Sequence, residues 1–320
     1  MKRKWTAELE QALRERIEQI GEKEGIDLIS YISAERFERK SLERSQRNDP
    51  HNFLPEAHSI VVVGVYIGGH SLPHWDDPRV GRTSRLFLSG FTRDVVLPIV
   101  PIASFLKEEG FQALICDTLQ PEGSVIPLKQ AALRAGMGWQ GKNSLILSSK
   151  FGSFLALGGL ITDALFESTE EKREDRCGNC RNCIEACPTG AIFEPYVVKQ
   201  EKCINYLLED NSPHPEASVL IGNRIFECEI CQTVCPWNKP HLESSLQTKR
   251  ALLFKEHLAA CEELFQLSRL EQLNSEQYQD LIATPFRTEV SYAIFRRNVE
   301  RALANSGQIL NGSPRFDGFQ

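Results

Sequence analysis

The residues best suited to chemistry in this chain are its cysteines, four of which form one dense run. The run consists of Cys177, Cys180, Cys183 and Cys187, followed directly by Pro188. Its pattern, C-x2-C-x2-C-x3-C-P, is the spacing with which bacterial ferredoxins hold iron–sulfur clusters. A second, shorter run consists of Cys228, Cys231 and Cys235, followed by Pro236. Two such runs predict two neighbouring clusters, and therefore a redox-active protein.

The two runs predict a definite set of cluster ligands. In two-cluster ferredoxins, the fourth cysteine of each run binds the cluster of the other run. The first cluster would then be held by Cys177, Cys180, Cys183 and Cys235, and the second by Cys187, Cys228, Cys231 and one further residue. Ile225 stands where the missing cysteine would be, and Cys203, between the runs, is its natural replacement. The two remaining cysteines, Cys116 and Cys261, are expected to be buried as small hydrophobic residues.

Two other uses of cysteine compete with this interpretation. A disulfide framework suits small secreted domains, whereas this chain has 320 residues and its basic start leads into a charged amphipathic segment, not a signal peptide. Zinc is the stronger competitor, because C-x2-C pairs also build zinc sites. Zinc sites usually take two separate pairs, however, and here the cysteines fall in runs that end in Cys-Pro. We therefore expect two iron–sulfur clusters.

Composition narrows the class of protein further. Hydrophobic residues make up 41% of the chain, enough for a sizeable core, and no apolar stretch approaches the ~20 residues of a membrane span. We therefore expect a soluble, cytoplasmic protein without a membrane partner. The net charge of −6 argues against a general nucleic-acid binder, although a local basic patch could still hold one RNA. Arg287, Arg296, Arg297 and Arg301 could form such a patch or an ordinary solvated helix face.

The elements that position the cysteines can be outlined from hydrophobic periodicity. Helices are expected at residues 6–24, with Thr6 as N-cap, at 101–109 and at 127–134. Strands are expected at 59–66, 111–116, 144–149 and 154–162. This alternation predicts an α/β or α+β domain over residues 1–165. A two-cluster, ferredoxin-like module follows at 166–245, beginning with a charged linker, and a helical segment occupies 246–320.

A glycine-rich loop, residues 136–144 (GMGWQGKNS), precedes the cysteine runs. It is not a phosphate-binding P-loop, because Asn143 separates the lysine from the serine and the flanking elements stand in the wrong order. The loop is either a tight turn between a helix and a strand, or a cofactor-lining loop in which Lys142 and Asn143 offer hydrogen-bond donors. Residue types alone favour the turn.

Several segments together resemble the epoxyqueuosine reductase family. They are the glycine loop from Ala135 to Leu145, Cys187 to Ile192 (CPTGAI), Cys203 to Leu207 (CINYL), Gly222 to Ile225 (GNRI) and Cys228 to Asn238 (CEICQTVCPWN). The resemblance spans about residues 55–305 and is specific from Gly136 to Asn238. It implies an oxidoreductase with two [4Fe–4S] clusters and cobalamin that reduces epoxyqueuosine to queuosine in tRNA.

The resemblance also implies a fold, partners and site residues. The fold class would be α+β, with a reductive-dehalogenase-like α/β cobalamin domain followed by the two-cluster module and the helical tail. The partners would be an external low-potential electron donor and a tRNA anticodon stem-loop. The implied cobalamin contacts are Trp139, Gly141, Lys142, Asn143, Ser144, Tyr206, Gly222 and Asn223. The clusters would feed electrons singly to the cobalt, while the protein positions and tunes the cofactor.

The proton donor implied by the resemblance is an aspartate shortly before the glycine loop. Local pattern selects Asp117, which ends an expected strand, whereas gapless counting back from Gly136 selects Glu122. The family's Asp-Tyr-His segment is also altered here, because residues 84–94 read SRLFLSGFTRD. Two alternatives therefore stay open: a related corrinoid reductase of another substrate, and a ferredoxin-like electron carrier that feeds a partner enzyme.

Overall fold

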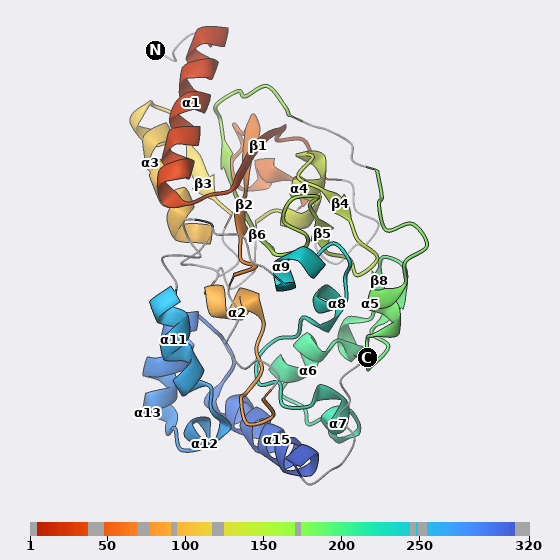
Figure 1. Cartoon of the computed structure of the whole chain (residues 1–320). Helices are drawn as coiled ribbons and strands as arrows, with labels where there is room; N and C mark the ends of the chain where they lie inside the picture. Colours follow the sequence, from red (N-terminus) through yellow and green to blue (C-terminus); the bar gives the residue numbers. More distant parts are fainter. Residues whose placement is uncertain are drawn as a thin grey trace. The chain divides into compact units, whose positions relative to one another are not determined.

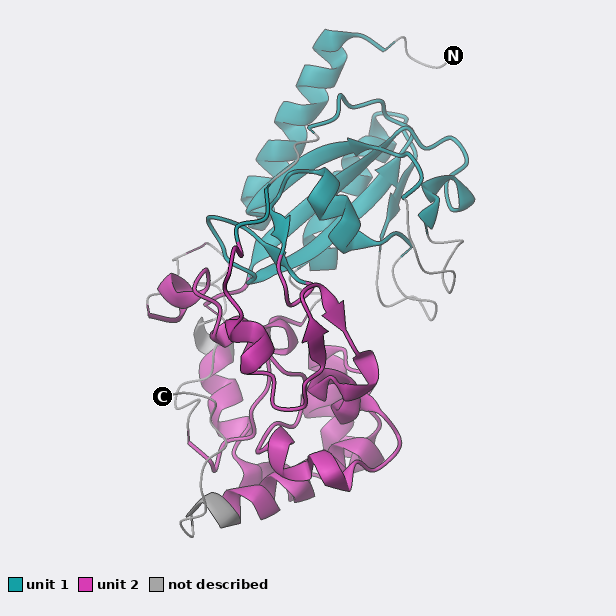
Figure 2. Ribbon diagram, turned by 90° about the vertical axis from the view of Figure 1, so that its right-hand side faces the viewer, with its two compact units in different colours: residues 1–66, 92–140, 145–176 teal, residues 67–91, 141–144, 177–320 magenta. Residues whose placement is uncertain are grey.

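The computed structural model describes residues 5–37, 48–69, 77–90, 95–116, 125–169, 174–243, 248 and 255–310. The chain divides into two compact units (Figure 2). Unit 1 comprises residues 1–66, 92–140 and 145–176, and unit 2 comprises residues 67–91, 141–144 and 177–320. This division differs from the expected series of three consecutive segments. Two stretches of the N-terminal half, 67–91 and 141–144, fold with the cysteine runs, and so does the helical tail.

Unit 1 is built on a four-stranded antiparallel sheet with the strand order β1-β2-β6-β3 (Figure 1). Its strands are β1 (Leu28–Ser33), β2 (Ser59–Tyr66), β6 (Leu155–Thr162) and β3 (Ala113–Ile115). The expected strand at 59–66 is β2, and all eight of its residues are buried. Its run of β-branched residues suits a strand that is covered on both faces. Strand β1 has no counterpart among the expected elements.

Three helices accompany this sheet, with three shorter elements. They are α1 (Ala7–Glu24), α3 (Leu97–Glu108), α4 (Leu128–Arg134), the 3₁₀ turn η2 (Pro50–Asn52) and the paired strands β4 (Trp139–Gln140) and β5 (Ile146–Leu147). Helix α1 begins as expected, because the Thr6 hydroxyl accepts the Leu9 N–H at 3.2 Å. Helix α3 begins four residues earlier than expected, with Pro98 in the first turn, where a missing N–H costs little.

Two adjacent glycines in β6 show how helices cover both faces of the sheet. A methyl group at Gly158 would strike the side chains of Val95 and Ile99, at the start of α3. A methyl group at Gly159 would point toward Leu128 of α4. Because consecutive strand residues face opposite sides of a sheet, α3 and α4 pack on opposite faces. The sheet of unit 1 is thus a layer between helices.

The glycine-rich loop contains a position at which only glycine fits. A methyl group at Gly138 would overlap the backbone carbonyl oxygen of Leu147 on the paired strand β5. We expect Gly138→Ala to lower the free energy of unfolding by about 3 kcal/mol, because the strands must separate to admit the methyl group. Thermal or denaturant unfolding measures this.

Gly307, in the last helix, is the matched control for that substitution. No atom lies within 4 Å of a methyl group built at Gly307, so Gly307→Ala is expected to stabilise the protein by roughly 0.5–1 kcal/mol. Equal stability of Gly138→Ala and the unmodified protein would contradict the close strand approach.

Unit 2 is assembled from short elements and a helical tail. Its N-terminal elements are α2 (Arg85–Ser89), α5 (Asn182–Glu185), β7 (Ile192–Glu194), β8 (Val197–Val198), η4 (Gln200–Lys202), α6 (Ile204–Glu209), η5 (Pro215–Ala217), α7 (Ser218–Ile221), α8 (Ile230–Thr233) and α9 (Lys239–Glu243). The tail consists of α11 (Lys255–Leu264), α12 (Leu267–Leu270), α13 (Ser275–Tyr278), η6 (Gln279–Ala283), α14 (Thr284–Phe286) and α15 (Tyr292–Leu310).

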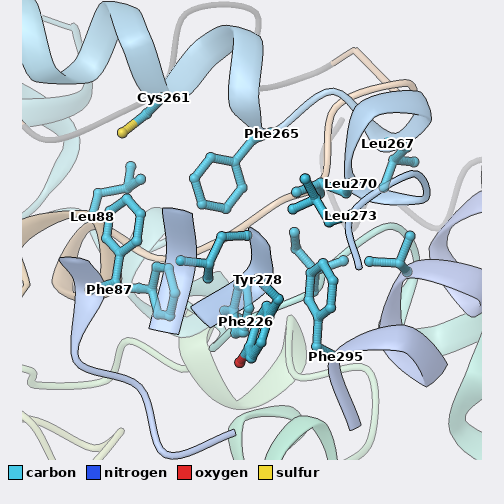
Figure 3. Close-up of a cluster of buried hydrophobic side chains, with 14 of the residues drawn as sticks. Phe87, Leu88, Phe226, Cys261, Phe265, Leu267, Leu270, Leu273, Tyr278 and Phe295 are labelled. Carbon is cyan, nitrogen blue, oxygen red and sulfur yellow. The ribbon is translucent and has the colours of Figure 1, made fainter. Parts of the chain in front are cut away.

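An aromatic core explains why the tail is not a separate domain. Phe87 of α2 stacks on Phe226, with ring centroids 4.2 Å apart, and Phe226 in turn stacks on Phe295 of α15 at 6.0 Å. Figure 3 shows Phe265, directly after α11, pointing into the same cluster. This core joins residues from α2, from the segment just before the second cysteine run and from the tail. Hydrophobic burial therefore ties together segments that the sequence places far apart.

Candidate functional site

The cysteine runs fold into two similar turns within unit 2. In the first run, the Cys180 N–H donates to the Cys177 carbonyl at 3.0 Å, and the one-turn helix α5 carries Cys183. In the second, the one-turn helix α8 carries Cys231, and the Cys235 N–H donates to the Gln232 carbonyl at 3.1 Å. Tight turns of this kind direct several thiols toward one point. These eight cysteines are partly exposed, and none of them forms a disulfide bond.

Electrostatic coupling places four thiols in a first group. Burial, together with the charges of Cys235, Cys177 and Cys180, raises the pKa of Cys183 to about 11. Burial also raises the pKa of Cys235, and the charges of Cys177 and Cys180 add to this effect. Like charges act in this way only at short range. The last cysteine of the second run thus lies beside the first three of the first run.

The other four thiols form a second group around Cys231. Burial raises the pKa of Cys231 well above its ordinary value, and the charges of Cys228, Cys203 and Cys187 add to the shift. Burial likewise raises the pKa of Cys228, to about 11; the Arg224 guanidinium opposes this shift, and the charges of Cys203 and Cys187 add to it. Cys203, between the runs, therefore lies where the replacement ligand was expected.

The chemistry of the two groups fits metal clusters. Four thiolates confined together repel one another, and bound metal removes this cost by replacing their protons. Cys183 also raises the pKa of Cys231, so the two groups adjoin. Among the described residues, no group of three or more His, Cys, Asp or Glu side chains is arranged to hold a single metal ion.

The glycine loop contributes three side chains to the frame of unit 2. The Lys142 ammonium donates to the carbonyl of Cys180 at 2.8 Å and to that of Gly178. The Asn143 amide donates to the carbonyl of Cys231 at 3.5 Å, and the Ser144 hydroxyl to that of Tyr196 at 2.7 Å. Lys142 thus contacts the turn that carries Cys180 of the first thiol group, and Asn143 contacts the turn that carries Cys231 of the second. The same loop was expected either to be a plain turn or to line a cofactor.

The side chains of the remaining predicted cofactor contacts differ in how far they are exposed. Trp139 is buried in β4, and Arg176 lies over its ring with its guanidinium 5.7 Å from the ring centroid. The buried Asn223 amide donates to the Val80 carbonyl at 2.7 Å. Tyr206 is partly exposed on α6. Trp139 belongs to unit 1, and Asn223 and Tyr206 belong to unit 2.

Two glycines of the predicted set belong to unit 2 as well. Gly141 begins the short stretch that carries Lys142. Gly222 follows α7 with φ 63° and ψ −138°, a conformation that suits glycine alone. A methyl group built there would meet only the guanidinium of Arg224, at 3.5 Å, so the face of Gly222 is open.

The two candidate proton donors, Asp117 and Glu122, lie outside the described residues. The structure does show that the preceding strand ends where expected. Strand β3 stops at Ile115, and Cys116 is buried in the core of unit 1. The choice between the two carboxyl groups stays a prediction.

Two tail arginines have a structural role that differs from both expectations. The Arg297 guanidinium donates to the carbonyls of Asp210 at 2.6 Å, Ser212 at 2.9 Å and Leu207 at 3.3 Å. Arg301 donates to the carbonyl of Arg224. Arg297 therefore satisfies carbonyls at the end of α6, as basic residues commonly do at helix C-termini. Both guanidinium groups are thus engaged by backbone carbonyls of unit 2 and are partly buried.

No helix in the described part of the chain is long and apolar enough to cross a membrane.

The family described as a 4Fe-4S double cluster binding domain matches residues 176–238. These residues include all eight cysteines of the two thiol groups. The match supplies the metal-binding class that thiol positions alone do not specify.

Curated relatives match most of the chain. Epoxyqueuosine reductase from Salmonella typhimurium is 34% identical over 273 residues, which cover 81% of this chain and 67% of the relative. The enzyme of the same name from Escherichia coli is 33% identical over 268 residues, which cover 81% of this chain and 68% of that relative.

Solved structures agree with the described fold. Epoxyqueuosine reductase from Streptococcus thermophilus superposes with a TM-score of 0.74 at 22% identity, covering 95% of this chain and 87% of that one. An epoxyqueuosine reductase crystallised with a tRNA-Tyr epoxyqueuosine-modified stem loop gives 0.72 at 24% identity, covering 93% and 82%. These likenesses confirm the expected α+β fold class.

Proposed function

Since the chain belongs to the epoxyqueuosine reductase family, we propose that it reduces epoxyqueuosine to queuosine in tRNA with two [4Fe–4S] clusters and cobalamin. The observation that carries this proposal is the interleaving of the two cysteine runs into two adjoining groups of four thiols. Adjoining clusters form a short path for single electrons, which a reductase needs. The relative bound to a modified tRNA stem loop supports the choice of substrate.

The clusters are assigned to the two thiol groups of unit 2. The first would be held by Cys177, Cys180, Cys183 and Cys235, and the second by Cys187, Cys203, Cys228 and Cys231. Lys142 fastens a ligand turn of the first cluster, and Asn143 reaches a ligand turn of the second. The loop between β4 and β5 thereby supports the geometry that sets cluster potential.

Cobalamin, when bound, supplies the reduced cobalt centre at which the epoxide is reduced. Among the predicted contacts, Tyr206 offers a partly exposed ring and Gly222 an open backbone face, and both suit a large flat cofactor. Lys142, Asn143, Ser144 and Asn223 use their side chains to hold backbone carbonyls. Their part in binding would therefore be to position the chain around the cofactor.

Reduction of an epoxide to an alkene consumes two electrons and two protons and releases water. A positioned carboxylic acid would supply the proton that the departing oxygen needs, and we assign this role to Asp117 in preference to Glu122. The electrons must come from an external low-potential donor, received one at a time by the clusters. The setting we propose is the cytoplasm, where tRNA and such donors are available.

The proposal is tested by anaerobic purification, followed by measurement of iron, sulfide and cobalamin absorbance. About eight iron atoms per chain and one bound cobalamin are expected. A chemically reduced sample should then convert epoxyqueuosine in an anticodon stem-loop to a product lighter by one oxygen atom, detected by mass spectrometry.

Each failure of that test has a distinct meaning. Eight irons without affinity for cobalamin would contradict the reductase and favour the ferredoxin-like carrier. Cobalamin binding without turnover would favour a corrinoid reductase of another substrate. The altered segment at residues 84–94, which lacks the family's Tyr-His pair, is the observation in favour of that second candidate.

A further inference from the structure

A buried ion pair links α2 to the loop that carries the second cluster's ligands. The Arg85 guanidinium pairs with one carboxylate oxygen of Glu229, and the Arg85 backbone N–H donates to the other at 3.0 Å. The Arg85 Nε also donates to the Gly68 carbonyl at 3.1 Å. The two side chains are only 8% and 5% exposed. Glu229 stands directly after the ligand Cys228, so the pair is anchored beside the predicted cluster.

The residues on the other side of Cys228 are held by the same short helix. The Ser84 hydroxyl donates to the Glu227 carboxylate, and the ring of Phe87 stacks on Phe226 with an interplanar angle of 11°. Glu227 adopts φ 50°, a left-handed conformation that a non-glycine residue keeps only under firm constraint. The backbone is therefore fixed on both sides of Cys228 by consecutive contacts from α2.

Glu229 also governs the position of the next ligand. Its carbonyl accepts the N–H groups of Gln232 and Thr233, both at 2.9 Å, and so begins the one-turn helix α8 that carries Cys231. A displacement of Glu229 would move two of the four ligands together. The ordinary alternative is a buried ion pair that merely fastens two segments of unit 2.

We propose that Arg85 and Glu229 form a positioning pair for the second cluster, which sets its reduction potential and its resistance to loss. Net charge and hydrogen bonding around a cluster determine its potential, and buried charges act strongly because water does not screen them. Arg85 balances a carboxylate held between two ligands. The inference rests on the proposed function only in requiring that the second cluster be present.

The charge of each partner predicts the sign of the shift in the reduction potential of the second cluster when that partner is replaced. Arg85→Met leaves an unbalanced anion near the cluster, so the second potential is expected to become more negative. Glu229→Gln leaves an unbalanced cation, so the same potential is expected to become more positive. The double variant restores neutrality and should return most of the way to the unmodified value. Redox titration of the full, cluster-loaded chain, followed by electron paramagnetic resonance, measures each potential without requiring turnover.

The rate at which the protein releases iron to a chelator is a second measurement. It remains informative for a variant whose second cluster is too unstable for a redox titration. Arg85→Lys keeps the charge but cannot reproduce the paired geometry of a guanidinium. It should release iron to a chelator about 10-fold faster than the unmodified protein, while its potential stays unchanged. A shift in the Lys variant as large as that in Arg85→Met would contradict the role of charge.

Arg79 is the matched control, because it forms an exposed pair with Asp77 in the same segment, at 2.6 Å. Arg79→Met should change neither potential nor iron release. The inference would be overturned if the potential of the second cluster shifted in the same direction in Arg85→Met and Glu229→Gln, or did not shift in either. The pair would then have only a structural role. Failure of the unmodified chain to hold about eight irons would instead overturn the proposed function.

Discussion

Replacing Cys203 by alanine is expected to remove one of the two clusters and to abolish turnover. Iron content should fall from about eight to about four atoms per chain, because alanine offers no ligand and the second group is left with three thiolates. The resonance signal of the first cluster should persist, since its four ligands are untouched. Iron and sulfide assays with resonance spectroscopy on the purified protein measure these outcomes.

The physical basis of this expectation is the position of Cys203 in the second thiol group. Burial raises the pKa of Cys203, and the charge of Cys187 raises it further, so a ligand of the first run lies beside it. Burial also raises the pKa of Cys228, to which Cys203 contributes. Retention of all eight irons and both signals in Cys203→Ala would show that another residue completes the second cluster.

Cys261→Ala is the control for a cysteine outside the two groups. Cys261 is 2% exposed and packs in the aromatic core of unit 2. Its replacement removes buried volume and should cost about 1 kcal/mol of stability, with iron content unchanged. Loss of iron in this control would mean that a general weakening of unit 2, and not ligand removal, explains the Cys203 result.

Replacing Asp117 by asparagine is expected to lower the rate of epoxide reduction by about 10²- to 10⁴-fold, the usual contribution of a positioned acid or base. Asparagine keeps the size of the side chain and removes its transferable proton. Cluster and cobalamin spectra should be unchanged, because the substitution leaves the thiol groups intact. Single-turnover measurement with an epoxyqueuosine stem-loop separates the chemical step from electron delivery.

Glu122→Gln is the paired control for Asp117→Asn, since each removes one carboxyl group from the segment before the glycine loop. We expect Glu122→Gln to keep nearly full activity. The reverse pattern, full activity in Asp117→Asn with loss in Glu122→Gln, would move the proton donor to Glu122. Full activity in both variants would place the acid elsewhere in the protein.

The features predicted well from the sequence are those encoded over short distances. The buried strand at 59–66 and the N-cap at Thr6 were recognisable because their signals lie within a few residues. The double-cluster domain was also recognisable, since the spacing within each cysteine run is a local signal, whereas the assignment of each thiol to a cluster stays a prediction. The family of the chain was recognised from the same local motifs and is confirmed by its relatives.

The features that were missed depend on contacts across the chain. Residues 67–91 join the cysteine-bearing unit because Phe87 shares a core with Phe226 and Phe295. The sequence also did not show that the Lys142 ammonium donates to the carbonyl of Cys180, 38 residues away. No local pattern reports the partner of a lysine or a phenylalanine, so these assignments could not be made from sequence.

The sequence by itself therefore determined the class of chemistry of this protein: two cysteine runs with ferredoxin spacing and the family to which they belong. Chelation depends on residue type and close spacing, and both are visible in a linear chain. Only the tertiary structure decided what supports that chemistry. Arg85 and Glu229 stand 144 residues apart and meet because folding buries them together. Burial and charge balance are properties of the packed molecule, which the order of residues alone does not display.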